Sequence, residues 1–285
     1  MVARAIQRLP ITDGPSGGVG RPIKNEGGCA VSAWKERLIK LAFWAAVIGA
    51  VLTPLAAFGT KGGLWTYSFG FQVLQAGLVA LIVAAVLAII GLVWSLVSQP
   101  RDGLSRALLT LIIAAAVAAI PANTLRTAFS GQFAPIHDIS TDVADPPQFV
   151  EILPLRGADA NTTVYADKIV SFGADKGKHY SEIQARFYPD VESVILTDAP
   201  ADAFVKALAV VDQMGWELVA ADADEGRIEA TDTTFWFGFK DDVVIRLREQ
   251  GEGTRLDIRS SSRVGMGDVG ANVTRIRAYV AALTE

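Results

Sequence analysis

Cysteine and histidine are scarce in this sequence of 285 residues. Cys29 is the only cysteine, which excludes a disulfide framework or a cysteine-based zinc site within one chain. Only His137 and His179 offer imidazoles for proton transfer near neutral pH. No GxSxG, Walker A, dinucleotide-binding or zinc-protease motif occurs. The sequence therefore favours a protein without a cofactor and without catalytic activity; a hydrolase would need clustered acids or histidines that no motif indicates.

Charge is missing from long stretches of the first half of the chain. Three apolar runs cover Leu38–Phe58, Phe71–Val97 and Leu104–Leu125, and the second holds no charged residue. Hydrophobic residues make up 51% of the chain, and its mean hydropathy is +0.34. Because about 20 apolar residues cross a bilayer core, these runs predict three membrane spans. No acid or base lies at the centre of a span, so ion transport has no visible carrier.

The second run contains a repeat of small residues. Alanine recurs every four positions at Ala76, Ala80, Ala84 and Ala88. Small side chains let helices approach closely in a membrane, so this repeat predicts a packing surface. We favour packing within the protein's own helical bundle over packing against a partner helix.

Basic residues are distributed unequally between the two sides of the predicted spans. Nine lie before the first span or between the second and third: Arg4, Arg8, Arg21, Lys24, Lys35, Arg37, Lys40, Arg101 and Arg106. Only Lys61 and Arg126 lie in the segments on the opposite side. Positively charged segments stay in the cytoplasm, so we expect a cytoplasmic N-terminus and a C-terminal domain on the far side. In a bacterial inner membrane, that side is the periplasm.

The change in composition predicts four segments. We expect a disordered cytoplasmic tail at 1–33, a three-helix transmembrane domain at 34–126, a stalk at 127–150 and a periplasmic domain at 151–285. From His137 onward, 26 acidic residues outnumber 15 basic ones. This acidic part has no basic aromatic stripe, so nucleic acid is not an expected partner.

The last segment alternates between short strand-like and helical patterns. Strands are expected at 191–197, 216–221, 226–233, 242–249 and 254–261, and helices at 199–215 and 267–283. Short Gly/Asp turns between strands predict antiparallel pairing. The fold class is therefore a two-layer α+β domain with an antiparallel sheet and helices on one face, joined to an α-helical three-span membrane domain.

The strand pattern places many charged side chains on the face of the sheet opposite the helices. They are Arg227, Glu229, Arg246, Arg248, Arg255, Asp257 and Arg259. A mixed-sign ladder of this kind is typical of a solvated sheet face, with a surface for a polar ligand or partner as the alternative. The aromatic stretch TFWFGF at 234–239 predicts core or edge packing, or a docking surface if its rings are exposed together.

Residues 135–149, PIHDISTDVADPPQF, bring one histidine close to several aspartates. His137, Asp138 and Asp142 are weak candidates for metal ligands, because imidazole and carboxylates bind metals. The spacing matches neither HExxH nor an EF-hand loop. Pro146 and Pro147 stiffen an extended chain, so we favour a stalk or docking segment without a metal.

The stretch SSSRVGMGDVGAN at 260–272 is the better candidate for a binding site. Arg259, Arg263, Gly265, Gly267 and Asn272 surround the predicted start of the last helix, where free N–H groups attract anions. The nearby Asp268 instead favours a helix cap, which would repel a phosphate. We favour capping, with a small anion or lipid headgroup as the alternative ligand.

Three segments of the acidic half resemble a known family. YPDVESVILTDAP, EATDTTFWFGFKDDVVIRL and RLDIRSSSRVGMGDVGANVTRIRAYV are similar to the bacterial and plastid family called domain of unknown function 1499. The resemblance covers roughly residues 135–284, and its last segment is the most specific. The Asn-Cys-Val-Ser-Ser signature of other members is absent, so no cysteine-dependent role is implied. The resemblance implies a domain boundary and a location in the cell envelope.

These observations favour a non-catalytic inner-membrane protein whose periplasmic domain is an interaction or assembly subunit. The expected partners are the bilayer and another membrane protein or complex. An envelope module that binds a lipid or small anion is the alternative.

Overall fold

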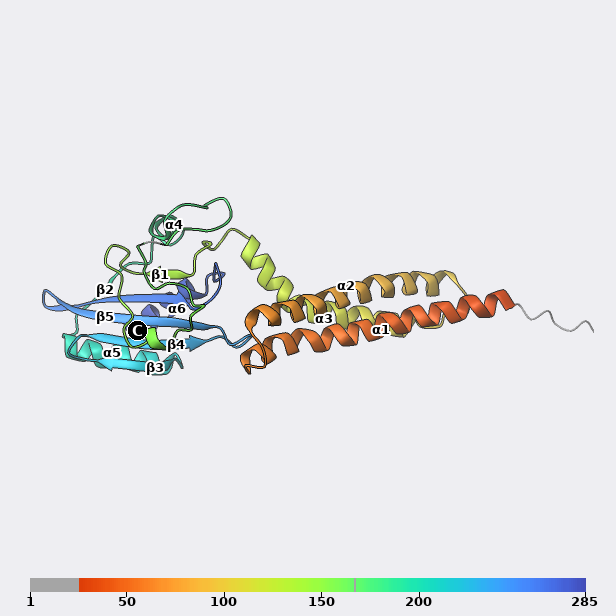
Figure 1. Cartoon of the computed structure of the whole chain (residues 1–285), viewed down its shortest axis with the longest axis horizontal. Helices are drawn as coiled ribbons and strands as arrows, with labels where there is room; N and C mark the ends of the chain where they lie inside the picture. The colour runs from red at the N-terminus through yellow and green to blue at the C-terminus, as the bar shows by residue number, and fades with distance from the viewer. Residues whose placement is uncertain (1–25, 167) are drawn as a thin grey trace, which may run out of the picture.

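The computed structural model describes residues 26–166 and 168–285, with side chains from Ser32 onward. A helical bundle and an α+β domain lie end to end (Figure 1). This arrangement confirms the predicted fold class. Most of the predicted tail at 1–33 lies outside the described residues, but its end does not: the first helix already begins at Glu26.

Three helices form the bundle: α1 (Glu26–Lys61), α2 (Tyr67–Val97) and α3 (Leu104–Phe129). Each is long and apolar enough to cross a membrane. Many of their large apolar side chains lie on the outside of the bundle. Such a surface suits hydrocarbon and is uncommon on a protein surrounded by water.

Small residues line the contact of α2 with its neighbours. The buried residues of α2 are Gly70, Gly77, Leu81, Ala84, Ala88, Gly91 and Ser95. The predicted alanine ridge is therefore only half correct, because Ala84 and Ala88 are buried but Ala76 is exposed. A four-residue repeat drifts around a helix that has 3.6 residues per turn, so the repeat leaves the contact face.

The C-terminal domain is built on one antiparallel sheet with the strand order β1-β6-β5-β4-β3, and β2 also pairs with β6. The strands are β1 (Asp138–Ser140), β2 (Val194–Leu196), β3 (Glu217–Asp222), β4 (Arg227–Thr233), β5 (Lys240–Gln250) and β6 (Gly253–Ser262). The β5–β6 hairpin pairs Ile245 with Ile258 at the centre of the sheet. The five predicted strands are all present, and β1 is an addition.

One face of the sheet packs under α5 (Pro200–Gln213) and α6 (Ala271–Thr284). Ile245, Ile258 and Val273 are fully buried in this core. The helix α4 (Tyr180–Phe187) also contributes to the core, and the sequence pattern did not reveal it. With only eight residues, α4 is too short to establish a helical repeat.

The other face of the sheet lies under residues 141–164, here called the covering segment, which includes the short 3-10 helix η1 (Leu153–Leu155). Phe149 and Ile152 of this segment pack on Val244. The prediction that this face is solvated is wrong for Asp257 and Arg259, which are fully buried, whereas Arg248 is exposed as expected. Alternation in a strand shows which side chains share a face, but it does not show what covers that face.

The predicted stalk at 127–150 is also wrong for most of its length. Its first residues continue α3 to Phe129, and β1 pairs with β6 through Asp138 and Ser261. Residues 141–150 belong to the covering segment, and Ala134 and Ile136 before β1 are buried in the core. Asp142 lies within the domain because it pairs with Arg246 and Arg255 of distant strands, which the local sequence does not show.

Candidate functional site

Arg259, a predicted anion ligand, lies at the centre of the charged face of the sheet. Its Nε and Nη2 atoms donate to the Asp138 carboxylate at 2.9 and 2.8 Å. Nη1 donates to the carbonyl of Pro147 at 3.1 Å, and Nη2 also donates to that of Thr163 at 2.7 Å. The guanidinium stacks over the Phe149 ring, 5.0 Å from its centre. This side chain therefore joins β1, β6 and the covering segment, and its fork is occupied by the protein itself.

Asp138 receives a second buried cation. The Lys168 ammonium lies 2.5 Å from the Asp138 carboxylate, and both side chains are almost completely buried. Burial by itself raises the pKa of Asp138, but Arg259 and Lys168 outweigh burial and hold it below its ordinary value. Asp138 is thus an ionised group shared by two cations rather than an open metal ligand.

Arg263, the second predicted anion ligand, is also paired. Its Nη2 and Nε atoms donate to the Asp242 carboxylate at 2.8 and 2.9 Å, and Nη1 donates to the Leu155 carbonyl at 2.8 Å. Asp242 also accepts from Arg156 at 2.5 Å and from Thr231 at 2.9 Å. Both arginines of the predicted site are therefore held by carboxylates of the same chain.

Asn272 is buried at the start of α6. Its amide donates to the His137 carbonyl at 3.1 Å and to Ser262 Oγ at 2.9 Å, and its Oδ1 accepts from Ser260 at 2.6 Å. These contacts use the side chain to fix the β6–α6 loop. Asn272 has a structural role and does not face an open site.

The glycine turn before α6 already holds an anionic group. Gly265 has a φ of +96°, and its carbonyl accepts from Asn161 at 2.9 Å. A Cβ atom on Gly267 would meet only ordinary van der Waals contacts. The Asp268 carboxylate accepts from the backbone N–H groups of Gly270 and Asn272 at 2.9 and 2.8 Å. Asp268 thus occupies the N–H groups that the sequence offered to a phosphate.

The three metal candidates do not converge. Asp138 binds cations, and Asp142 accepts from Arg255 at 2.6 Å. His137 Nδ1 lies 2.8 Å from Tyr180 Oη, and burial together with Lys168 lowers the pKa of His137 to about 4. In the two described ranges, no group of three His, Cys, Asp or Glu side chains is placed to hold a metal ion.

Residues 138–283 match a family described as protein of unknown function (DUF1499), which is more than half of the chain. The chain belongs to this family. No curated protein matches the sequence. The match begins at the first residue of β1, so the DUF1499 domain includes the covering segment and confirms the resemblance seen in the sequence.

The charged face of the DUF1499 domain contains further ion pairs. Their arginines were predicted from the sequence to be exposed to solvent. Arg246 donates to Asp257 at 2.8 Å and to the Asp145 carbonyl at 2.8 Å. At the edge of the face, a cavity of about 260 Å³ is lined in part by Arg227, Arg246 and Arg248. All three arginines form ion pairs with carboxylates of the domain. The strand alternation placed these residues on one face, but it did not reveal their ion-pair partners.

The aromatic stretch forms the contact between the DUF1499 domain and the bundle. We call this contact the aromatic clamp; it joins Phe235, Trp236, Phe237 and Phe239 of the β4–β5 loop to Phe58, Tyr67 and Phe71 of α1 and α2. The closest pair of rings is Phe71 and Phe237, 5.1 Å apart. Lys61 Nζ donates to the Phe235 carbonyl at 3.2 Å. Figure 1 places this loop beside the α1–α2 turn.

The clamp combines packing with exposure, the two alternatives that the sequence left open. Phe235 is 65% exposed and Trp236 is 40% exposed, although both contact Phe58. Gly238 has a φ of +66°, and a Cβ atom there would lie 2.8 Å from Lys61 Cγ. Glycine is therefore required both for the turn and for the close approach of the loop to α1.

Proposed function

We propose that this DUF1499 protein is an accessory subunit of a bacterial inner-membrane complex, with a cytoplasmic N-terminus and a periplasmic C-terminal domain. The domain acts by binding and presenting another membrane protein during assembly, not by catalysis. The excess of basic residues on the N-terminal side supports this orientation. The three apolar helices support the anchorage.

The aromatic clamp is the observation that carries this proposal. Rings near the end of α1 and the start of α2 meet the β4–β5 loop, so the domain is held directly against the bundle as well as through the chain after α3. A domain on a flexible stalk would sample many orientations. A domain held in one position presents the same surface, at a fixed distance from the membrane, to a neighbouring membrane protein. A subunit of a defined complex requires such a fixed position.

The first experiment tests the partner. The full-length protein is purified in mild detergent, and co-purifying proteins are quantified by mass spectrometry. A reproducible membrane-protein partner is expected, and its recovery should fall at least fivefold in the double variant Phe58→Ala/Phe71→Ala. The matched control is Ile82→Ala, which removes an exposed apolar side chain of α2 away from the clamp. Repeated recovery of the protein alone would contradict the proposal.

The second experiment tests the orientation. Alkaline phosphatase, which is active only in the periplasm, is fused after Glu285, and a cytosolic fluorescent reporter is fused there in a parallel strain. Phosphatase activity without fluorescence is expected. The reverse result would place the DUF1499 domain in the cytosol and remove the proposed role.

Anion binding at the β6–α6 loop is not the function that we propose. Arg259 and Arg263 donate to Asp138 and Asp242, and Asp268 occupies the backbone N–H groups of the turn. A phosphate at this loop would have to displace three carboxylates of the same chain.

A further inference from the structure

The four rings of the β4–β5 loop form two pairs with different surroundings. Phe237 and Phe239 are half-buried, because they pack on α2. Phe235 and Trp236 contact Phe58 of α1, yet both remain exposed. The loop therefore has an inner pair of rings covered by the bundle and an outer pair, Phe235 and Trp236, whose exposed faces have no role in the proposed accessory function.

The outer pair lies at the level where the apolar part of α1 ends. The α1 segment between Lys40 and Lys61 holds no charged residue and is about 30 Å long at about 1.5 Å per residue, which matches the thickness of a hydrocarbon core. Phe58 lies within one helical turn of Lys61, at one edge of this segment. The ring centres of Phe235 and Trp236 are 5.8 and 5.4 Å from that of Phe58, so both rings lie near the same edge.

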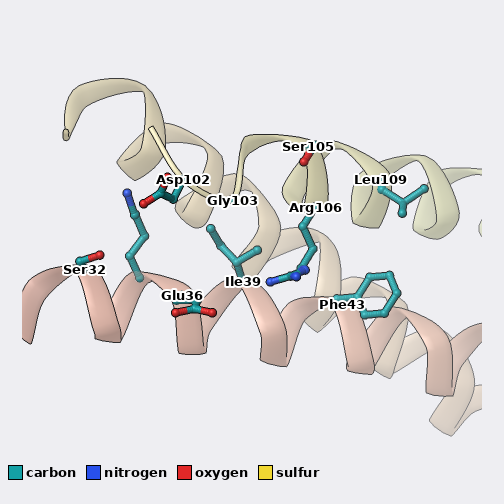
Figure 2. A pocket seen from close by; sticks show the side chains of 10 residues that line it. Ser32, Glu36, Ile39, Phe43, Asp102, Gly103, Ser105, Arg106 and Leu109 are labelled. Carbon is teal, nitrogen blue, oxygen red and sulfur yellow. The ribbon is translucent and has the colours of Figure 1, made fainter. Parts of the chain in front are cut away.

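The other end of the bundle is polar and marks the opposite edge. On the N-terminal side of Lys40, a cavity between α1 and the start of α3 is lined in part by Glu36, Asp102 and Arg106 (Figure 2). Charged side chains are rare inside a hydrocarbon core, so this end lies outside it. The uncharged length of α1 then places Phe58 and its ring partners at the boundary nearest the DUF1499 domain.

Polar groups of the loop are paired within the protein, as a membrane environment requires. The Thr234 N–H donates to the Phe239 carbonyl at 2.9 Å, and the Phe239 N–H donates to Thr234 Oγ1 at 2.9 Å. The Trp236 carbonyl accepts from Thr234 Oγ1 at 2.8 Å and from the Gly238 N–H at 2.5 Å. Unpaired backbone groups are costly in hydrocarbon, so this pairing favours entry of the rings into lipid.

Lys61 provides the polar contact expected at such a boundary. Its ammonium donates to the Phe235 carbonyl at 3.2 Å and lies over the Phe235 ring, 5.3 Å from its centre. A lysine at the end of a span keeps its methylene groups in the apolar region and extends its ammonium toward the headgroups. Phe58 and Phe71 of the apolar runs are exposed and contact the loop rings. The apolar surface is therefore continuous from the bundle to the loop.

We propose that Phe235 and Trp236 insert into the bilayer leaflet nearest the DUF1499 domain, where lipid covers the ring faces that the protein leaves exposed. The β4–β5 loop is then a membrane contact of the domain in addition to the three helices. This contact depends on the helices crossing a membrane. It needs neither the orientation nor the partner proposed above, so it would remain if either of those experiments failed.

Spin-label accessibility in lipid nanodiscs tests this contact. In the full-length protein with Cys29→Ser, which removes the natural cysteine, a nitroxide is attached after Phe235→Cys, with one chain in each disc. Oxygen concentrates in hydrocarbon, and a nickel chelate stays in water. The ratio of oxygen to nickel accessibility at position 235 should exceed that at position 195 by at least about fivefold, because a hydrocarbon core excludes water.

Ile195→Cys is the matched control, and Ile82→Cys is the reference for lipid at the centre of a span. Ile195 is also exposed, but it pairs with Arg255 at the end of the sheet away from the aromatic clamp. Ile82 is exposed at the middle of α2. A ratio at position 235 equal to that at position 195 would place the outer rings in water, and exclusion of both reagents would mean that protein covers them. Either result would overturn the proposal.

Quenching of tryptophan fluorescence by brominated phospholipid tests the natural ring without a label. Trp236→Phe keeps an aromatic side chain and removes one fluorophore from lipid, so the quenched fraction of the emission should fall. Trp216→Phe is the matched variant in the domain core, where Trp216 is buried and stacks on Tyr279. Its quenched fraction should rise, because an unquenched fluorophore is lost. An unchanged or larger quenched fraction in Trp236→Phe would exclude insertion of this ring.

Discussion

The two faces of the DUF1499 sheet are both buried, but by different means. One face carries Val243, Ile245, Leu256 and Ile258 under the two long helices. The other carries Glu229, Asp242, Asp257 and Arg259 under a covering segment with little regular structure. The comparison shows that a charged strand face is not necessarily a solvated face. A polar segment elsewhere in the chain can bury it, provided that each charge has a partner.

The two faces differ in how they depend on pairing. An apolar face is stabilised roughly in proportion to the area removed from water, whatever its exact contacts. A buried ion pair contributes little net stability by itself, but removal of one partner leaves an uncompensated charge. The charged face therefore specifies where the covering segment lies. A single substitution in this face should lower the free energy of unfolding by more than a single substitution in the apolar core.

The largest effect is expected for Asp138→Ala. This change leaves Arg259 and Lys168 buried without their carboxylate. It should lower the free energy of unfolding of the domain by about 3–5 kcal/mol. Hydrogen exchange of the β6 amides in the full-length protein measures it. The control is Asp145→Ala. The Asp145 side chain is 60% exposed, so this substitution should lower the free energy of unfolding by less than about 1 kcal/mol. Equal losses in the two variants would contradict the distinction between buried and exposed pairs.

The apolar face is tested by Ile258→Ala. The side chain is fully buried under the helices, so a cavity and lost transfer energy should together cost about 3 kcal/mol. The same hydrogen-exchange measurement applies. Ile195→Ala, which shortens an exposed side chain on β2, should change the free energy by less than about 0.5 kcal/mol. A loss at Ile258 no greater than that at Ile195 would mean that the helices do not seal this face.

Acid should weaken the junction between β1 and the β6–α6 loop through His137. Its folded pKa of about 4 lies below the ordinary 6.5, so folding favours the neutral ring. The resulting stability is complete above pH 6.5 and is lost as the pH falls toward 4, by about 3 kcal/mol. Exchange rates of the loop amides between these pH values measure the loss, after correction for the intrinsic pH dependence. His137→Gln should flatten the dependence, and an unchanged slope would exclude His137 as its source.

Asp268 acts in the opposite direction within the same pH window. Burial raises its pKa to about 6, so its contribution to stability increases as the pH falls below that value. Asp268→Asn keeps an oxygen acceptor at the start of α6 but cannot titrate. The acid-induced loss should therefore be steeper in this variant than in the natural protein.

The smallest effect is expected at the aromatic clamp. Phe58 and Trp236 lie 5.4 Å apart, and such pairs contribute about 1 kcal/mol. A double-mutant cycle with Phe58→Ala and Trp236→Ala, followed by hydrogen exchange of residues 234–239, should give a coupling energy of that size. The pair Phe58→Ala and Leu218→Ala should be additive, since Leu218 lies exposed on β3. Additivity in both cycles would mean that the domain is not clamped.

The sequence was sufficient for the elements that carry a long or regular pattern. The three apolar helices, the β5–β6 hairpin and the closing helix α6 all follow from periodicity and composition. It was insufficient for β1 and α4, which are too short to establish a period. The sequence predicted a possible anion site at the β6–α6 loop, but Arg259 and Arg263 are paired with Asp138 and Asp242 rather than open. Their partners lie 121 and 21 residues away, beyond the reach of any local pattern.

By itself, the sequence determined which segments are long and apolar enough to cross a membrane and which residues alternate along strands, because both properties depend on side-chain polarity and local spacing. Only the tertiary structure decided that the charged face is buried and that the aromatic loop meets α1 and α2. It also decided that Lys35 is buried against the neutral oxygens of Ser98 and Pro100. The physical reason is that burial and charge pairing depend on segments distant in the chain, and these meet only when the chain is folded.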